Sequence, residues 1–80
     1  MTCRDQVLKS AKAIVQNKGS NEFTILEILD YMNLMGTTYK ESTIRTHITS
    51  RMCKNAPKHH AVKFHDFERI RHGQYRLSEN

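Results

Sequence analysis

STIRTHITSRM, residues 42–52, spaces Ile44, Ile48 and Met52 four positions apart, as the buried stripe of an α-helix would. Hydroxyls and cations fill most of the other positions. Ser and Thr form helices less readily than the Glu and Lys of an ordinary solvated face, at a cost of roughly a few tenths of a kcal/mol each. The polar side of this helix is therefore expected to be a contact surface.

Apolar residues upstream of this stretch predict two further helices. Their helical spacing indicates a first helix over about 4–18, closed by Gly19 in the left-handed conformation. Thr24 and Glu27 have the spacing of a capping box, which starts a second helix over about 25–35. The residues expected in the core of these helices are Val7, Leu8, Ala11, Ile14, Val15, Ile25, Ile28, Leu29 and Met32.

The third helix contains the opening stretch. Residues 38–41, TYKE, repeat the T-x-x-E spacing, so this helix is predicted from about 39 or 40 to 53. Asn55 is a candidate left-handed cap after it, and Pro57 cannot continue a helix. A turn of about three or four residues containing Gly36 would join the second and third helices, as in a helix-turn-helix.

The remainder of the chain changes to the pattern of β-strands. Two short runs, 67–71 and 74–77, flank His72 and Gly73, which fit a two-residue hairpin turn. Residues 58–66 fit either a strand or a loop laid over the core. The side chains expected to face inward from the hairpin are Ile70, Tyr75 and Leu77.

This order of elements predicts an α+β fold that is mostly α: a winged helix with three helices and a C-terminal β-hairpin wing. With 80 residues, 38% hydrophobic and 26% charged, the chain is expected to form one globular domain over 1–80, with its core at about 5–77. No apolar run approaches the roughly 20 residues that span a bilayer. A cytoplasmic, nucleoid-associated protein without a membrane partner is expected, with Cys3 and Cys53 as reduced thiols.

The net charge of +5 is carried by one half of the chain. Residues 1–39 hold four Lys or Arg against four Asp or Glu, whereas residues 40–80 hold nine against four. Such asymmetry favours an anionic partner. A solvated basic surface that only keeps the protein soluble is the alternative.

The run YKESTIRTHITSRM (39–52), followed by NAP (55–57), HH (59–60) and DFERIRHGQYRL (66–77), resembles winged helix-turn-helix modules of bacteria and archaea. These include modules attached to restriction-type endonucleases, and the resemblance covers about residues 5–77. It implies a domain that binds double-stranded DNA, with recognition helix 40–53 in the major groove and a basic hairpin wing, 66–77, along the backbone or the adjacent minor groove.

At about 100° per residue, the hydroxyls of the third helix lie opposite its buried stripe, where short side chains allow deep entry into a groove. Arg45 is the best candidate for a bidentate contact to guanine, with a phosphate contact as the alternative. The hydroxyl residues expected at the DNA are Ser42, Thr43, Thr46, Thr49 and Ser50, and the cations that suit phosphates are Lys40, Arg51 and Lys54.

In the hairpin, Arg71 and His72 lie at the predicted tip and are the residues expected to reach DNA. The role of Arg69 stays open, because arginines here also fit ion pairs with Asp66 or Glu68 across the hairpin.

Other classes of function have weaker patterns. Cys53, His59, His60 and His65 lack the paired spacing of a zinc site, and no metal or cofactor is expected. The eight acidic residues are dispersed, which argues against an enzyme. The sequence therefore predicts a small regulator or the DNA-reading module of a larger restriction/modification-type system, acting as a homodimer or with a nuclease or modification partner. The alternative is a winged-helix protein-interaction module without DNA binding, for example one that dimerises through its first helix, which an exposed apolar patch would mark.

Overall fold

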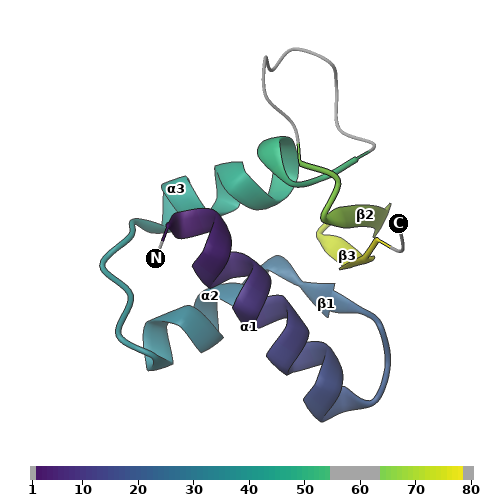
Figure 1. The fold of residues 1–80 in the computed structure, drawn as a ribbon, viewed down its shortest axis with the longest axis horizontal. Coiled ribbons are helices and arrows are strands. Elements are labelled where there is room, and N and C mark those ends of the chain that lie inside the picture. The colour runs from purple at the N-terminus through teal and green to yellow at the C-terminus, as the bar shows by residue number, and fades with distance from the viewer. Residues whose placement is uncertain (1, 55–63, 79–80) are drawn as a thin grey trace.

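A computed structural model of the chain describes residues 2–54 and 64–78 and has the mostly helical α+β, winged-helix-like layout that the sequence predicts (Figure 1). The predicted roles of Asn55, Pro57, His59 and His60, and most of the segment 58–66, lie outside the described residues. The elements are α1 (Cys3–Lys18), β1 (Phe23–Thr24), α2 (Ile25–Leu34), α3 (Glu41–Thr46), the π-helix η1 (His47–Arg51), β2 (Phe67–Arg71) and β3 (Gln74–Leu77).

Capping interactions set the starts of α1 and α2. The Thr24 hydroxyl accepts from the Glu27 amide at 3.1 Å, and the Glu27 carboxylate accepts from the Thr24 amide at 2.8 Å, which confirms the predicted capping box. A second capping box joins Thr2 and Asp5 at the start of α1, where the sequence analysis had not identified one. Gly19 ends α1 with φ +74°, the left-handed conformation predicted for it.

The three strands form one antiparallel sheet in the order β1-β3-β2. The predicted two-residue turn is present, with Gly73 at φ +76°. The inward placement of Ile70 is wrong, since 38% of this residue is exposed. The cause is a register shift in β2: Arg69 pairs with Tyr75 and Arg71 pairs with Gln74, so Ile70 between them has no partner residue on β3. Ile70 therefore does not follow the alternation of inward and outward side chains along the strand.

Aromatic contacts at the sheet join the two ends of the chain. Phe23 on β1 packs edge-on against Phe67, with ring centroids 4.9 Å apart, and stacks on Tyr75 at 6.2 Å. All three are buried within a core supplied by the three helical segments. The buried residues that sequence periodicity predicted are Val7, Ala11, Ile14, Ile28, Met32, Ile44, Ile48, Met52 and Tyr75, while Leu8, Val15, Ile25, Leu29 and Leu77 are partly buried.

The predicted capping box of the third helix is wrong, although the helix begins within one or two residues of the predicted start. Lys40 is the residue before α3, and no side chain caps the helix, so residues 38–41 do not form a capping box. The connection spans 35–40, which is longer than expected. Thr37 supplies its polar contact instead: its hydroxyl donates to Gln6 Oε1 on α1 at 3.0 Å, which anchors the connection to the first helix.

The end of the third helix also differs from the prediction of a continuous α-helix to 53. From His47 the chain widens into a π-helix, in which the amide of Met52 donates to the carbonyl of His47 at 2.9 Å. Beyond it, Phe67 N donates to Met52 O at 2.8 Å and Lys54 N donates to Phe67 O at 2.8 Å. The π-helix therefore ends just before the residues that are hydrogen-bonded to β2.

The caps of α2 and α3 give a matched test of this description. Thr24→Ala is expected to lower the free energy of unfolding by about 1 kcal/mol, because it removes a capping hydroxyl. Thr38→Ala is expected to change it by less than about 0.5 kcal/mol, because no capping bond to Thr38 exists. Urea unfolding followed by circular dichroism measures both, and equal losses for the two variants would contradict the assigned caps.

Candidate nucleic-acid interface

The outward side of α3 and η1 presents the hydroxyl residues that the sequence singled out. Ser42 and Thr46 are exposed, whereas Thr43, Thr49 and Ser50 are half-buried. An ideal α-helix would place all five on one outward face, but the π-helix changes the angular spacing after Thr46. The hydroxyl row is consequently more exposed at the start of the helix than at its end.

Two of these hydroxyls have their hydrogens committed within the helix. Thr46 Oγ1 donates to Ser42 O and Thr49 Oγ1 donates to Arg45 O, each at 2.9 Å. Their oxygens keep lone pairs, so both side chains are left as acceptors toward an external donor. The amino groups of adenine and cytosine are donors of this kind in the major groove.

His47 belongs to the same surface. Its Nδ1 lies 2.9 Å from Thr43 O. Because a carbonyl can only accept, Nδ1 carries the hydrogen of this bond and Nε2 is left for an external group. A shallow hollow of ≈ 240 Å³ on this side is lined by Ser42, Thr43, Thr46, His47 and Arg51.

A larger groove of ≈ 570 Å³ lies between the third helical segment and the hairpin tip. Arg45 and Thr49 line it from one side, and Arg69 and His72 line it from the other. Leu26, on the first turn of α2, also lines this groove and is 63% exposed. Its position outside the apolar stripe of α2 was the available sequence signal for an exposed leucine, and the sequence analysis did not use it.

Arg45 has an ion-pair partner in this structure. Its Nε donates to Glu41 Oε2 at 3.0 Å, one helical turn away, and both side chains are largely exposed. Exposed pairs of this type contribute little stability and exchange readily for other partners. The contact to guanine predicted for Arg45 therefore requires Glu41 to release it.

The remaining predicted cations fall into two groups. Lys54 Nζ lies 3.9 Å from Glu68 Oε2. Glu68 is on β2, where it also pairs with Arg76 of β3. Within residues 2–54 and 64–78, no ion pair involves Lys40, Arg51 or Arg71, and all three are exposed, as is His72. The residues of this second group can bind an anion without first breaking an ion pair with a carboxylate.

Arg76 on β3 is held by the sheet. Its Nε donates to Glu68 Oε1 at 2.7 Å, which is the cross-hairpin pairing that the sequence analysis left open for the wing arginines. This hydrogen bond and the charge of Arg76 lower the pKa of Glu68, with a smaller contribution from Lys54.

Metal-binding clusters and membrane-spanning helices were also sought in the part of the chain that the structure describes. No group of three or more His, Cys, Asp or Glu residues there is arranged to hold a metal ion. Cys3 and Cys53 are both buried, and neither forms a disulfide with the other. None of the helices in the described ranges has both the length and the apolar character needed to cross a membrane.

Comparison with known proteins places the chain in a family. Residues 5–77 match the family model described as "Domain of unknown function (DUF7669)", and the chain belongs to this family. Neither the curated proteins nor the solved structures gave a match.

The pairing of Arg76 with Glu68 gives a prediction about titration. Because the guanidinium favours the charged carboxylate, Arg76→Ala is expected to raise the pKa of Glu68 toward its ordinary value. The carboxyl carbon shifts of Glu68 followed by NMR between acidic and neutral pH measure this change. Asp5, whose pKa is lowered by its capping contact with Thr2, is the internal control and should titrate as in the wild type. An unchanged Glu68 titration would contradict the pairing.

Proposed function

We propose that this domain binds double-stranded DNA without catalysing a reaction, as a small regulator or as the DNA-reading module of a larger restriction/modification-type system. The third helical segment, α3 and η1, enters the major groove, and the hairpin of β2 and β3 contacts the backbone or the adjacent minor groove. One observation carries the proposal: side chains of α3, η1 and the hairpin tip line the same groove and so lie on the same part of the surface.

The cations without ion-pair partners in the described ranges support the backbone contacts. Lys40 and Arg51 stand at the two ends of the third helical segment, and Arg71 lies beside His72 at the hairpin turn. Phosphate contacts from separated points fix the position of a protein on a duplex without reading its sequence. The excess of positive charge in residues 40–80 agrees with this role.

Base reading is assigned to the middle of the segment. Thr46 and Thr49 offer acceptor oxygens because their hydrogens are used within the helix. Arg45 is able to donate two parallel hydrogen bonds to guanine once it leaves Glu41. Leu26 supplies an apolar contact from α2, suited to a thymine methyl group or a sugar.

A protein-interaction role is favoured by a different observation. Leu34 is 82% exposed and Met35 is 65% exposed, so the apolar mark expected of such a module is present at the end of α2. These residues do not line the groove between the third helical segment and the hairpin. The two roles therefore use separate surfaces and do not exclude one another.

The first test is a salt titration with labelled random-sequence duplex DNA. If about five phosphates are contacted, the slope of log K against log salt is expected to be about −4 to −5. Arg51→Ala and Arg71→Ala should each reduce the size of the slope by about 1. Lys12→Ala is the matched control, because it removes an exposed cation of α1 and should leave the slope unchanged. Absence of binding at low salt, or equal effects of all three variants, would overturn the proposal.

The pair of Glu41 and Arg45 gives a second test. Glu41→Gln is expected to tighten binding to random DNA on the order of fivefold at low salt, since it removes a negative charge worth ~1 kcal/mol and releases Arg45. In an Arg45→Ala background, the gain from Glu41→Gln should be smaller, because there is no arginine to release. Fluorescence anisotropy of the four proteins measures this cycle. The same gain in both backgrounds would show that Glu41 does not act through Arg45.

A further inference from the structure

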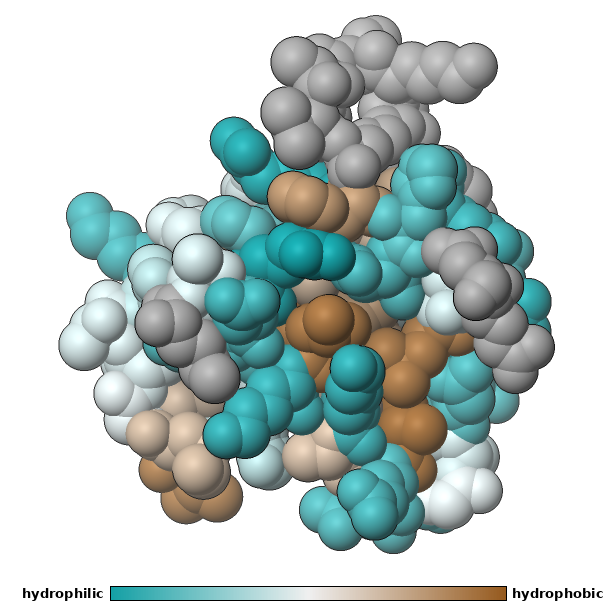
Figure 2. Space-filling view, in the orientation of Figure 1, coloured by the Kyte–Doolittle hydropathy of each residue, from teal (hydrophilic) through white to brown (hydrophobic). Residues whose placement is uncertain are grey.

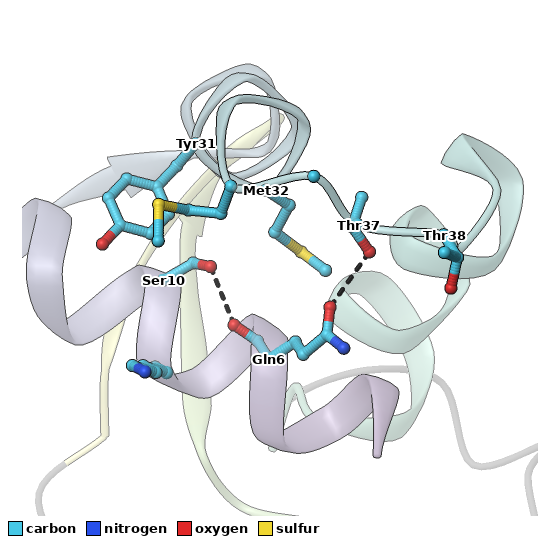
Figure 3. A pocket seen from close by; sticks show the side chains of 9 residues that line it. Gln6, Ser10, Tyr31, Met32, Thr37 and Thr38 are labelled. Carbon is cyan, nitrogen blue, oxygen red and sulfur yellow. Dashed lines mark hydrogen bonds between the residues drawn. The ribbon is translucent and has the colours of Figure 1, made fainter. Parts of the chain in front are cut away.

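A second groove lies between α1, α2 and the connection that follows α2 (Figure 3). Its volume is ≈ 290 Å³. Tyr31 and Met32 lie on the α2 side, with Ser10 and Gln6 facing them from α1. It is separate from the groove beside the hairpin, because none of the residues that line one lines the other.

The polar groups at this groove are largely used within the chain. Ser10 Oγ donates to Gln6 O at 2.8 Å, and Thr37 Oγ1 donates to Gln6 Oε1 at 3.0 Å (Figure 3). Tyr31 and Met35 therefore supply its main unused surface, which is apolar, whereas Met32 is buried in the core. Methionine side chains adapt to the shape of an incoming apolar group.

An apolar projection stands directly beside this hollow. Leu34 and Met35, the most exposed large hydrophobic residues of the described chain, end α2 and begin the connection. Figure 2 shows apolar atoms at the lower left of the molecule, where α2 ends in Figure 1. The same surface thus carries both an apolar hollow and an apolar projection.

Opposite charges flank the groove and the projection beside it. Lys9 lines it from α1 and is exposed. Asp30 precedes Tyr31 on α2, one helical turn before Leu34, and is also exposed. No ion pair found in residues 2–54 and 64–78 involves Lys9 or Asp30.

We propose that this surface binds a second copy of the chain across a two-fold axis. Leu34 of each copy enters the groove of the other and packs against its Met35, and Lys9 of each copy faces Asp30 of the other. A two-fold contact uses the same patch twice, so the patch must be complementary to itself. A hollow with a cation at its edge, beside a projection flanked by an anion, meets that requirement, whereas a basic or an acidic partner would match only one of the two charges.

A charge-exchange experiment tests this dimer. The molar mass of the full chain is measured by light scattering and sedimentation from low micromolar to near-millimolar concentration, and dimer formation is expected for the wild type. Lys9→Glu and Asp30→Lys should each weaken the dimer by about tenfold or more, because each variant places like charges together twice. Mixing the two variants should restore association, since both contacts in the mixed dimer again join opposite charges. Lys12→Glu makes the same charge change elsewhere on α1 and should leave the dimer unchanged.

Each possible outcome either supports or contradicts the proposed dimer. A wild type that stays monomeric over this range, a dimer indifferent to both variants, or a mixture that does not recover would each overturn the proposal. Methyl NMR of the unaltered protein supplies an independent measurement: the Met35 resonance should move with concentration, while that of Met52, which is buried in the core, should not. A Met35 resonance that does not depend on concentration would also overturn it. None of these measurements requires DNA.

Discussion

The burial of Phe23 against Phe67 and Tyr75 is the contact on which the rest of the arrangement depends. It joins a residue two positions before α2 to both strands of a hairpin more than forty positions away in the chain, and Phe23 and Tyr75 are also a pair in the ladder of β1 and β3. Without it, the hairpin would be fixed to the rest of the chain by polar contacts, among them the bonds between Met52, Lys54 and β2. Burial of large aromatic rings is the strongest single apolar contribution that a domain of this size can gain, so the hairpin has a defined direction relative to the third helix.

A second constraint acts at the base of the hairpin, next to Phe67. Both Nε and Nη2 of Arg4 donate to the carboxylate of Asp66 at 2.9 Å, and the guanidinium lies 3.9 Å from the centroid of the Phe64 ring. This paired contact ties the first turn of α1 to the residue before β2. Together with the aromatic cluster, it holds the start of β2, while the amide of Ile25 donates to the carbonyl of Gly73 at the turn and His72 stays exposed. A hairpin that is held in place and exposes a side chain at its tip is suited to contact a large ligand.

Local patterns in the sequence predicted the elements well, and distant contacts account for what they missed. The Thr24 cap, the Gly19 and Gly73 conformations and the strand limits depend on a few adjacent residues, so spacing was sufficient to predict them. The π-helix at 47–51 is coupled to bonds with β2, and the longer connection at 35–40 is anchored to Gln6, and neither partner is visible to local periodicity. For the candidate site, residue types were predictable from composition, whereas the pairing of Arg45 with Glu41 and the exposure of Leu26 required the packed structure. The bulge that exposes Ile70 belongs to the same class, because it reflects the register between two strands.

The connection at 35–40 gives the two proposed surfaces a fixed relation. It begins with Met35 in the apolar groove and ends with Lys40 at the start of α3, while the Thr37 bond to Gln6 holds its middle. A single winged-helix module buries only about 600–1,000 Å² on DNA, so specific binding gains most from a second module at a set distance. In a dimer built through the groove of α1 and α2, that distance would depend on the path of this connection. The six residues that made it longer than an ordinary helix-turn-helix turn would then serve to separate the dimer contact from the DNA contact, so that one face can be occupied without covering the other.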